Sequence, residues 1–195
     1  MITVISPENF KTIPWKNGLG ETTELAINEH GTLERFDWRL SIASVVEDGI
    51  FSDFSDYDRN LILIEGNGIR LTQDQSTTDN LIKKLDVASF AGACKTFGSL
   101  IDGGIKDFNI ITNQKTMTPI VQCFTEQHKA SVDIPLNTLC FAYSLSSSIE
   151  VESSANEKQH VPLGSLVKIS HLPSEENQYW VSGKDLILVI LKSKD

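Results

Sequence analysis

The stretch that decides the fold is NLILIEGNGIRL, residues 60–71, in which two apolar arms flank the polar segment Glu-Gly-Asn-Gly. Apolar runs of this length, interrupted by glycine and asparagine, predict two β-strands joined by a hairpin or a bulged turn. We therefore expect similar strands along the rest of the chain.

Short β-rich runs separated by turn-forming residues recur from end to end. The clearest are FDWRLSIASVV (36–46), PIVQCF (119–124), TLCFAYSL (138–145), SLVKIS (165–170) and DLILVILK (185–192). No stretch shows a sustained helical period, and TDNLIKKLD (78–86) fits either a strand or a helical turn. Many short strands at this spacing predict an all-β sandwich or barrel.

The second half of the chain contains a weaker echo of the opening stretch. Residues 138–153, TLCFAYSLSSSIEVES, again place an apolar run, a turn of small polar residues and an alternating strand in that order. The echo fits two β-barrel halves that meet between residues 100 and 120.

Composition excludes several classes of function. The chain has 195 residues, is 40% hydrophobic and carries 17 basic against 26 acidic residues, a net charge of −9. Such a charge repels nucleic acid and anionic membrane surfaces, so we expect neither as a partner. No apolar run is long enough to span a membrane, and MITVISPENF has neither the basic start nor the apolar core of a signal peptide, which predicts a cytoplasmic protein.

The sequence offers no recognisable metal, cofactor or nucleophile site. The three cysteines are odd in number and widely spaced, which predicts free, buried thiols. The four histidines are scattered, with no HxH pair and no carboxylate at matching spacing. A GxSxG nucleophile turn is also missing, so we expect no cofactor, no bound metal and no covalent catalysis.

The segment PWKNGLGETTEL (14–25) combines a proline, an aromatic ring, a cation, an amide and two glycines. A phosphate-binding loop would require a buried strand before it and a helix after it, whereas strand-like TTELAI follows here. The simpler alternative is a turn at Gly18 and Gly20, with Trp15 covering one edge of a core.

Arginine is the most unevenly distributed residue type: all four arginines lie within positions 35–70. A guanidinium group can hold a carboxylate through two parallel hydrogen bonds. Strand alternation places Arg39, Ser41 and Ala43 on one face, which suits the lining of a pocket. Arg59 immediately precedes an apolar strand, and an ion pair with Asp56 or Asp58 in the preceding turn is an equally good interpretation.

A further polar cluster lies in DGGIKDFNIIT (102–112), where Lys106, Asp107 and Asn109 adjoin a strand. Taken alone, this segment is also typical of a hairpin loop.

Three segments in this order and spacing resemble the HutD/Ves family: PWKNGLGETTEL, then residues 36–71, then DGGIKDFNIIT. The resemblance is close over residues 10–112 and rests on length and strand content elsewhere. It implies a bicupin, that is, two RmlC-like jelly-roll barrels in one chain. The implied single unit spans residues 1–195, with approximate halves 1–105 and 106–195.

The resemblance also implies a site at the mouth of one barrel, made by Trp15, Lys16, Asn17, Arg39, Arg59 and Asn109. Such a site would select a small anionic metabolite. The family's association with histidine utilisation or stress responses suggests a carboxylate such as formylglutamate. This sequence departs from the family pattern at Leu19 and Asp56, where glycine is common.

Three functions remain open at the level of sequence. The preferred one is a regulatory protein that binds a small carboxylate. The second is a metal-independent isomerase or hydrolase that uses Asp107 or Glu24 as a base, and the third is a structural or interaction role with a vestigial pocket. Binding is preferred because the clustered motifs supply cations and amides but no histidine. A homodimer is compatible with the sequence.

Overall fold

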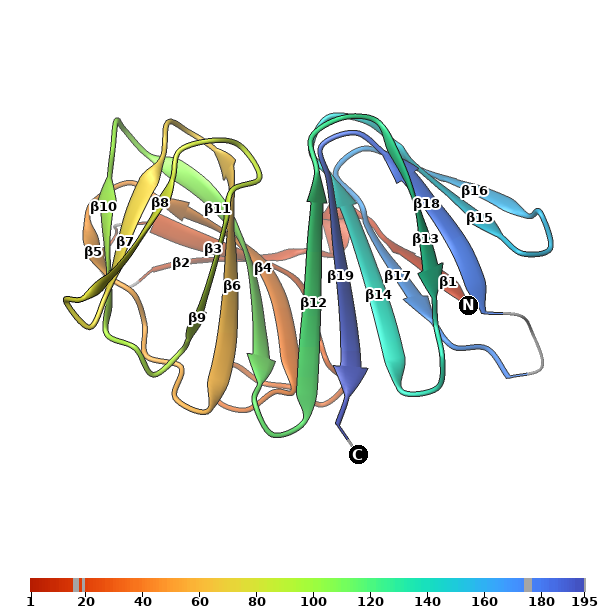
Figure 1. Cartoon of the computed structure of the whole chain (residues 1–195), viewed down its shortest axis with the longest axis horizontal. Helices are drawn as coiled ribbons and strands as arrows, with labels where there is room; N and C mark the ends of the chain where they lie inside the picture. Colours follow the sequence, from red (N-terminus) through yellow and green to blue (C-terminus); the bar gives the residue numbers. More distant parts are fainter. Residues whose placement is uncertain (16–17, 19, 174–176, 195) are drawn as a thin grey trace. The chain divides into compact units, whose positions relative to one another are not determined.

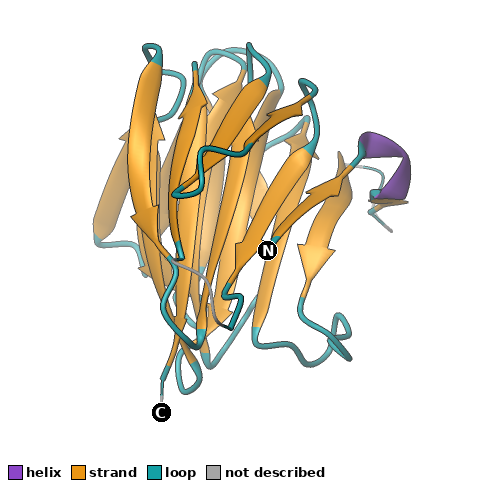
Figure 2. Ribbon diagram, turned by 90° about the vertical axis from the view of Figure 1, so that its right-hand side faces the viewer, coloured by secondary structure: helices purple, strands orange, loops and turns teal. Residues whose placement is uncertain are grey.

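The computed structural model of the chain describes residues 1–15, 18, 20–173 and 177–194. Strands make up 61% of the chain, and the helical part of the described residues is the single 3₁₀ turn η1 (Pro7–Asn9) (Figure 2). The prediction of an all-β protein is therefore confirmed. The described residues contain no helix with the length and apolar character of a membrane span.

The chain forms two compact units, which we call the N-unit (residues 10–117) and the C-unit (residues 1–9 and 118–195). This division differs from the expected halves 1–105 and 106–195 in two respects. Residues 105–113 form a central strand of the N-unit, hydrogen-bonded on both sides, so the boundary falls after them. The first strand, β1 (Ile2–Ile5), pairs with a strand of the C-unit.

The N-unit consists of two antiparallel sheets (Figure 1). The six-stranded sheet has the order β2-β3-β4-β11-β6-β9, and the four-stranded sheet has the order β5-β10-β7-β8. The strands are β2 (Lys11–Pro14), β3 (Gly20–Ile27), β4 (Trp38–Val45), β5 (Gly49–Ile50), β6 (Tyr57–Glu65), β7 (Ile69–Gln73), β8 (Thr77–Leu81), β9 (Val87–Ala91), β10 (Thr96–Leu100) and β11 (Ile105–Asn113).

The C-unit also has two antiparallel sheets, with the orders β1-β17-β14-β19-β12 and β13-β18-β15-β16. Its strands are β12 (Met117–Phe124), β13 (His128–Asp133), β14 (Thr138–Ser144), β15 (Ile149–Ser153), β16 (Lys158–Val161), β17 (Leu166–Ser170), β18 (Gln178–Gly183) and β19 (Leu186–Ser193).

The two units repeat one strand order. Adding eight to the numbers in β4-β11-β6-β9 and β5-β10-β7-β8 gives β12-β19-β14-β17 and β13-β18-β15-β16, which are the orders found in the C-unit. Strands β2 and β3 extend the repeat in the N-unit, and β1 extends it in the C-unit. The sequence echo at residues 138–153 therefore corresponds to a real repeat, in which β6–β7 and β14–β15 occupy equivalent places.

The hairpin predicted for residues 60–71 is wrong in its pairing. Strand β6 pairs with β9 and β11, whereas β7 pairs with β8 and β10 in the other sheet. Leu61, Ile62 and Leu63 are fully buried, as expected for a strand covered on both faces. Gly66 and Gly68 adopt positive φ angles of 98° and 129°, which turn the chain from one sheet to the other.

Two ambiguous segments are resolved as strands. Residues 77–81 form β8, so the strand alternative holds for the first four residues of TDNLIKKLD, and residues 82–86 form the turn that follows. Of DGGIKDFNIIT, residues 102–104 form the turn and the rest lies in β11, at the centre of the six-stranded sheet.

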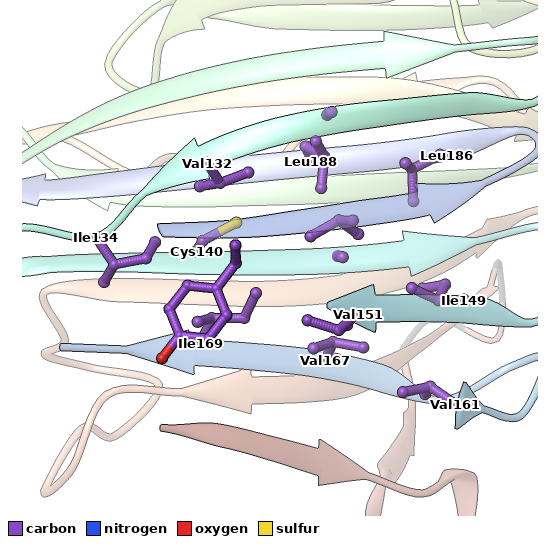
Figure 3. Close-up of a cluster of buried hydrophobic side chains, with 14 residues drawn as sticks. Val132, Ile134, Cys140, Ile149, Val151, Val161, Val167, Ile169, Leu186 and Leu188 are labelled. Carbon is purple, nitrogen blue, oxygen red and sulfur yellow. The ribbon is translucent and has the colours of Figure 1, made fainter. Parts of the chain in front are cut away.

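A large hydrophobic cluster fills the core of the C-unit (Figure 3). Residues from β13 to β19, among them Val132, Ile149, Val167 and Leu188, pack into one cluster, and Ile2 and Val4 of β1 cover it. Cys140 lies inside this cluster, where burial raises the pKa of its thiol to about 12. All three cysteines are free, as predicted, but only Cys140 is buried, since Cys94 and Cys123 are partly exposed.

Candidate functional site

Three adjacent strands of the N-unit carry the candidate site. Ile111 on β11 lies opposite Arg39 on β4 and opposite Arg59 on β6. Directly paired residues in an antiparallel sheet point to the same face, so both arginines extend from that face on either side of Ile111. Neighbouring strands lie about 4.8 Å apart, which separates the two arginine backbones by roughly 10 Å.

A cavity of about 600 Å³ lies over this row of residues. Arg39, Arg59, Ser41 and Asn109 supply polar groups to its wall. The wall is otherwise mainly apolar and aromatic, with Ile13, Trp15, Val45, Phe51, Phe54 and Ile111 among its residues. The predicted placement of Arg39, Ser41 and Ala43 on a pocket-lining face of β4 is confirmed.

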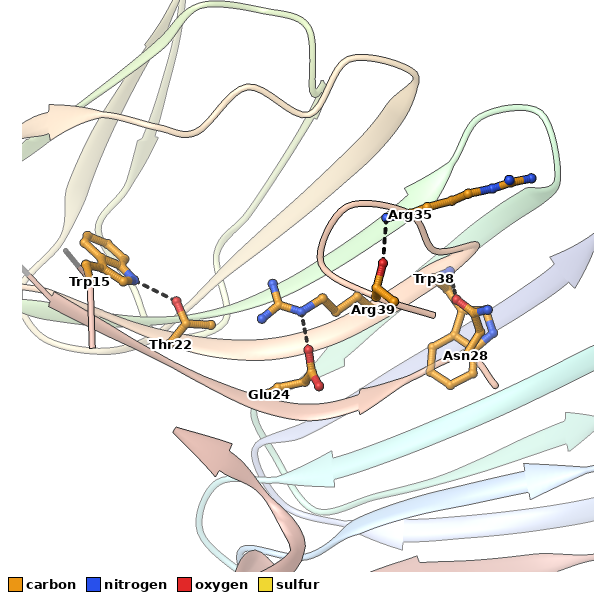
Figure 4. A network of polar contacts seen from close by, with 8 residues as sticks. Trp15, Thr22, Glu24, Asn28, Arg35, Trp38 and Arg39 are labelled. Carbon is orange, nitrogen blue, oxygen red and sulfur yellow. Dashed lines mark hydrogen bonds and ion pairs between the residues drawn. The ribbon is translucent and has the colours of Figure 1, made fainter. Parts of the chain in front are cut away.

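Arg39 presents an unpaired edge to the cavity. Its Nε donates a 2.7 Å hydrogen bond to Glu24 Oε2, which neutralises and orients the guanidinium group (Figure 4). Within the described residues, Nη1 and Nη2 have no protein partner, although only 7% of the residue is exposed. In Figure 4 this end of the side chain extends toward the Trp15–Thr22 pair, whereas Arg35 points away from it. Arg39 is thus oriented to receive an anion.

Trp15 forms the aromatic part of the wall at the turn between β2 and β3. Its Nε1 donates a 2.8 Å hydrogen bond to Thr22 Oγ1, and its backbone nitrogen donates to the carbonyl oxygen of Gly20. Gly18 has a φ of 73°, which suits glycine. A strand rather than a helix follows, so the phosphate-loop alternative is wrong. Gly20 is the first residue of β3, and Trp15 packs against a core cluster, as the simpler interpretation expected, while it also lines the cavity.

Arg59 is enclosed by aromatic rings. Its guanidinium carbon lies 5.0 Å from the ring centroid of Phe51, 5.4 Å from that of Phe54 and 5.3 Å from that of Phe90. Nη2 donates a 3.0 Å hydrogen bond to Asn109 Oδ1. Burial lowers the pKa of Arg59 to about 10, with Asp107 opposing the shift, so the side chain remains charged at neutral pH.

The alternative role of Arg59, a local ion pair with Asp56 or Asp58, does not hold in the described structure. Asp58 accepts a hydrogen bond from Gln114 Nε2, and Asp56 lies 3.7 Å from Lys115 Nζ. Asp56 has a φ of 71°, a conformation that favours glycine, which accounts for the glycine that the family resemblance implies at this position.

Asp107 lies beneath the cavity wall on β11 and is completely buried. Its Oδ1 accepts a short hydrogen bond from Asn109 Nδ2, so Asn109 joins the carboxyl group to Arg59. Burial raises the pKa of Asp107 to about 7, although the charge of Arg59 and the hydrogen bond from Asn109 both act to lower it.

The structure brings together four of the six predicted site residues: Trp15, Arg39, Arg59 and Asn109. Lys16 and Asn17 lie outside the described residues. Glu24 does not line the described wall but binds Arg39, and the carboxylates on the wall are Glu47 and Asp48 of an exposed loop. The described residues contain no cluster of three side chains suited to a metal ion.

Sequence reasoning missed the aromatic surroundings of Arg59. The phenylalanines in FSDFSDYDR, at positions 51 and 54, were a signal that could have been used. Phe90 gave no signal, because it meets Arg59 only through the pairing of β9 with β6.

Comparisons with known proteins show which family the chain resembles. The HutD family profile matches residues 7–187. An uncharacterized 21.2 kDa protein in the hutC 3′ region of Pseudomonas putida is 31% identical over 164 residues, 83% of each chain. Protein Ves of Escherichia fergusonii is 37% identical over 99 residues, which cover 50% of this chain and 51% of Ves.

Solved structures extend the likeness to the whole fold. HutD from Pseudomonas fluorescens SBW25 aligns with a TM-score of 0.81 and 28% identity, and the alignment covers 100% of both chains. A cupin 2 conserved barrel domain protein from Leptotrichia buccalis aligns with a TM-score of 0.55 and 10% identity over 94% of this chain and 96% of that one, which shows a cupin-like fold alone. The profile matches nearly the whole chain, the Pseudomonas putida relative aligns over 83% of it and the solved HutD structure aligns over 100% of it, so the chain belongs to the HutD family.

Proposed function

We propose that this protein binds a small carboxylate in the N-unit cavity and serves a regulatory role. The observation that carries the proposal is Arg39, a buried arginine whose Nη1 and Nη2 face the cavity with no protein partner among the described residues. Guanidinium donors that are open to the cavity and not used by the protein can hold an anion through charge-assisted hydrogen bonds. Arg59 adds a second positive charge about two strands away.

The side chains that line the N-unit cavity indicate the class of ligand that we propose. Two guanidinium groups favour carboxylates, while the aromatic and aliphatic side chains favour a ligand with an apolar body. The Pseudomonas putida relative is named for the hutC 3′ region, and the family resemblance points to histidine utilisation or stress responses. N-formyl-L-glutamate or a related intermediate of histidine breakdown, bound in the cytoplasm, is the specific candidate.

We further propose that the two units are the halves of a bicupin with jelly-roll topology. The support is the repeated strand order and the likeness to a cupin barrel protein. Under this proposal the N-unit half keeps the binding site, and the apolar interior of the C-unit half has a structural role.

The enzymatic alternative is less well supported. Asp107 has a raised pKa suited to a general base, but it is fully buried and does not line the cavity. Glu24 accepts a hydrogen bond from Arg39 Nε and pairs with its charge, which makes it a poor base. A base must come within hydrogen-bond reach of the proton that it removes.

Calorimetric titration with a panel of small carboxylates tests the binding proposal. We expect N-formyl-L-glutamate or a close analogue to bind, and Arg39→Met to weaken binding by about 30-fold to 1000-fold, because the main anion contact is lost. Arg35→Met is the matched control, since Arg35 is exposed and lies in a turn of the same unit. Unchanged affinity in Arg39→Met would overturn the proposal, and turnover of the ligand followed by NMR would favour the enzyme instead.

A further inference from the structure

A line of three buried polar side chains leads away from the cavity. Arg59 Nη2 donates to Asn109 Oδ1, and Asn109 Nδ2 donates to Asp107 Oδ1. Arg59 and Asn109 line the cavity, whereas Asp107 does not line it and is joined to them through its hydrogen bond with Asn109. Two atoms of this line are buried without a partner among the described residues: Asp107 Oδ2 and Arg59 Nε.

The surroundings of Asp107 leave it one charged neighbour. In the strand register it lies between Ala43 of β4 and Leu63 of β6, which are both apolar. The nearby core, formed by β4, β6, β7, β8, β9 and the start of β11, is apolar as well. Among the described residues, Arg59 is the charged group that acts on the carboxyl group.

We propose that Asp107 is a positioning residue that couples anion binding at Arg59 to the uptake of one proton. The inference rests on the proposed function and adds a regulatory property to the same site. When Asp107 is ionised, its negative charge offsets the attraction of Arg59 for an anion. When it is neutral, the full charge of Arg59 is available to the cavity.

The hydrogen-bond geometry allows this change without rearrangement. Oδ1 of Asp107 accepts from Asn109, while Oδ2 has no partner among the residues that the structure describes. A proton taken from solvent can therefore reside on Oδ2 and leave the link from Asp107 through Asn109 to Arg59 intact. Burial has already raised the pKa of this carboxyl to about 7, so the proton is gained or lost near neutral pH.

Linkage makes the coupling reciprocal: if a proton strengthens anion binding, the anion strengthens proton binding by the same factor. Above the pKa of Asp107 in the free protein, the affinity for the anion should fall as pH rises. The fall should approach tenfold per pH unit in the range where each binding event takes up one whole proton. No histidine lies on the described wall of the cavity, so a titration in this range reports on Asp107.

Calorimetric titration of the full chain with N-formyl-L-glutamate at about pH 6 and about pH 8.5 tests the proposal, because the carboxylates of this probe stay ionised over that range. We expect the dissociation constant of the wild type to rise by at least about tenfold. Titration at about pH 7.5 in two buffers of different ionisation enthalpy should show proton uptake by the wild type, a measurement that needs no variant.

Asp107→Asn keeps the acceptor for Asn109 and removes the titrating group. We expect this variant to bind at both pH values with the affinity that the wild type shows at low pH, whereas a merely structural role would weaken binding at every pH. Asp185→Asn, a buried aspartate of the C-unit, is the matched control and should keep the wild-type pH profile.

The outcomes separate the two proposals. Equal wild-type affinity at both pH values without proton uptake, or a pH dependence that persists in Asp107→Asn, overturns the coupling but leaves carboxylate binding standing. Failure of the wild type to bind any carboxylate at either pH overturns the proposed function, and the coupling falls with it.

Discussion

Arg59 has two roles at the residue scale, and its substitutions should separate them. Its side chain contacts three phenylalanine rings and Asn109 while it faces the cavity. Because the guanidinium group is part of both the packing and the site, its removal should affect stability as well as binding.

We expect Arg59→Ala to weaken carboxylate binding by about 2 to 4 kcal/mol, roughly 30-fold to 1000-fold, with the fold retained. Arg59→Lys should recover only part of the affinity, because an ammonium group cannot reproduce the planar fork. Calorimetry beside thermal melts makes the measurement. A lowered melting temperature with unchanged affinity would mean that Arg59 is purely structural.

Asp107 gives a prediction about stability that needs no ligand. Its pKa in the folded protein, about 7, lies above the ordinary value of an unfolded chain. The folded state therefore holds a proton that the unfolded state releases. The stabilisation from this group is complete below about pH 4 and is lost as pH rises to about 7, up to roughly 4 kcal/mol.

Denaturant unfolding of the wild type and Asp107→Asn at a series of pH values measures this effect. We expect the unfolding free energy of the wild type, minus that of Asp107→Asn, to fall from about pH 4 to about pH 7 and then to level off. A difference that does not change with pH would contradict the buried, protonated state of Asp107.

At this scale the sequence predicted which residues lie together better than it predicted their hydrogen-bond partners. Arg39, Arg59, Trp15 and Asn109 were selected by motif and resemblance, and they do meet. The partner of Arg59 was sought among neighbours in sequence, Asp56 and Asp58. Arg59 instead donates to the backbone oxygen of Ser52 and to Asn109 Oδ1, and the contact with Asn109, 50 residues away, depends on the pairing of β6 with β11.

At the scale of elements, the turn between β2 and β3 places Trp15 in the wall, and Gly20 makes room for it. A Cβ atom at Gly20 would lie 3.0 Å from Cε3 and Cζ3 of Trp15 and would clash with the carbonyl oxygen of Ser44 on β4. The absence of a side chain at this position thus permits both the strand pairing and the position of the ring.

We therefore expect Gly20→Ala to lower the unfolding free energy by about 1 to 3 kcal/mol and to displace Trp15. Denaturant unfolding and tryptophan fluorescence measure the two effects, and carboxylate affinity should fall with the displacement. Gly183→Ala is the control, since a Cβ there would make ordinary contacts of 3.4 Å or more. Equal changes in unfolding free energy and fluorescence in Gly20→Ala and Gly183→Ala would show that Gly20 has no special role.

Sequence patterns located the strands but not always their partners. NLILIEGNGIRL did predict two strands and a turn, yet the arms enter different sheets. The glycines and asparagine between the two arms predict a change of chain direction. Which sheet each arm joins depends instead on the burial of Leu61, Ile62 and Leu63 on both faces of their strand, and that burial requires elements distant in sequence.

At the scale of the whole molecule, the C-unit depends on the first residues of the chain. Ile2 and Val4 pack against its core, β1 pairs with β17, and the amino terminus donates to Tyr179 Oη. The boundaries expected from sequence missed this arrangement, because the nine residues carry no signal of a partner at residues 166–169.

We expect deletion of residues 1–9 to destabilise the C-unit by roughly 2 to 5 kcal/mol, the scale for losing two packed aliphatic side chains. Hydrogen exchange should show faster exchange in β17, while carboxylate binding in the N-unit should persist. The double variant Ile2→Ala with Val4→Ala, which keeps the strand, should produce most of the loss. Abolished binding in the deletion variant would show that the site depends on β1.

The pairing of Ile2 with Ile169 also sets an order of events during synthesis. A ribosome makes a chain from the amino terminus at about 5–20 residues per second, and domains fold as they emerge. Residues 10–117 can fold as soon as they leave the exit tunnel, but β1 must wait until β17 (Leu166–Ser170) has been made. Strand β1 is therefore synthesised before the N-unit but incorporated after it, and a nascent chain stalled after residue 117 should hold a formed N-unit cavity while β1 is still unpaired.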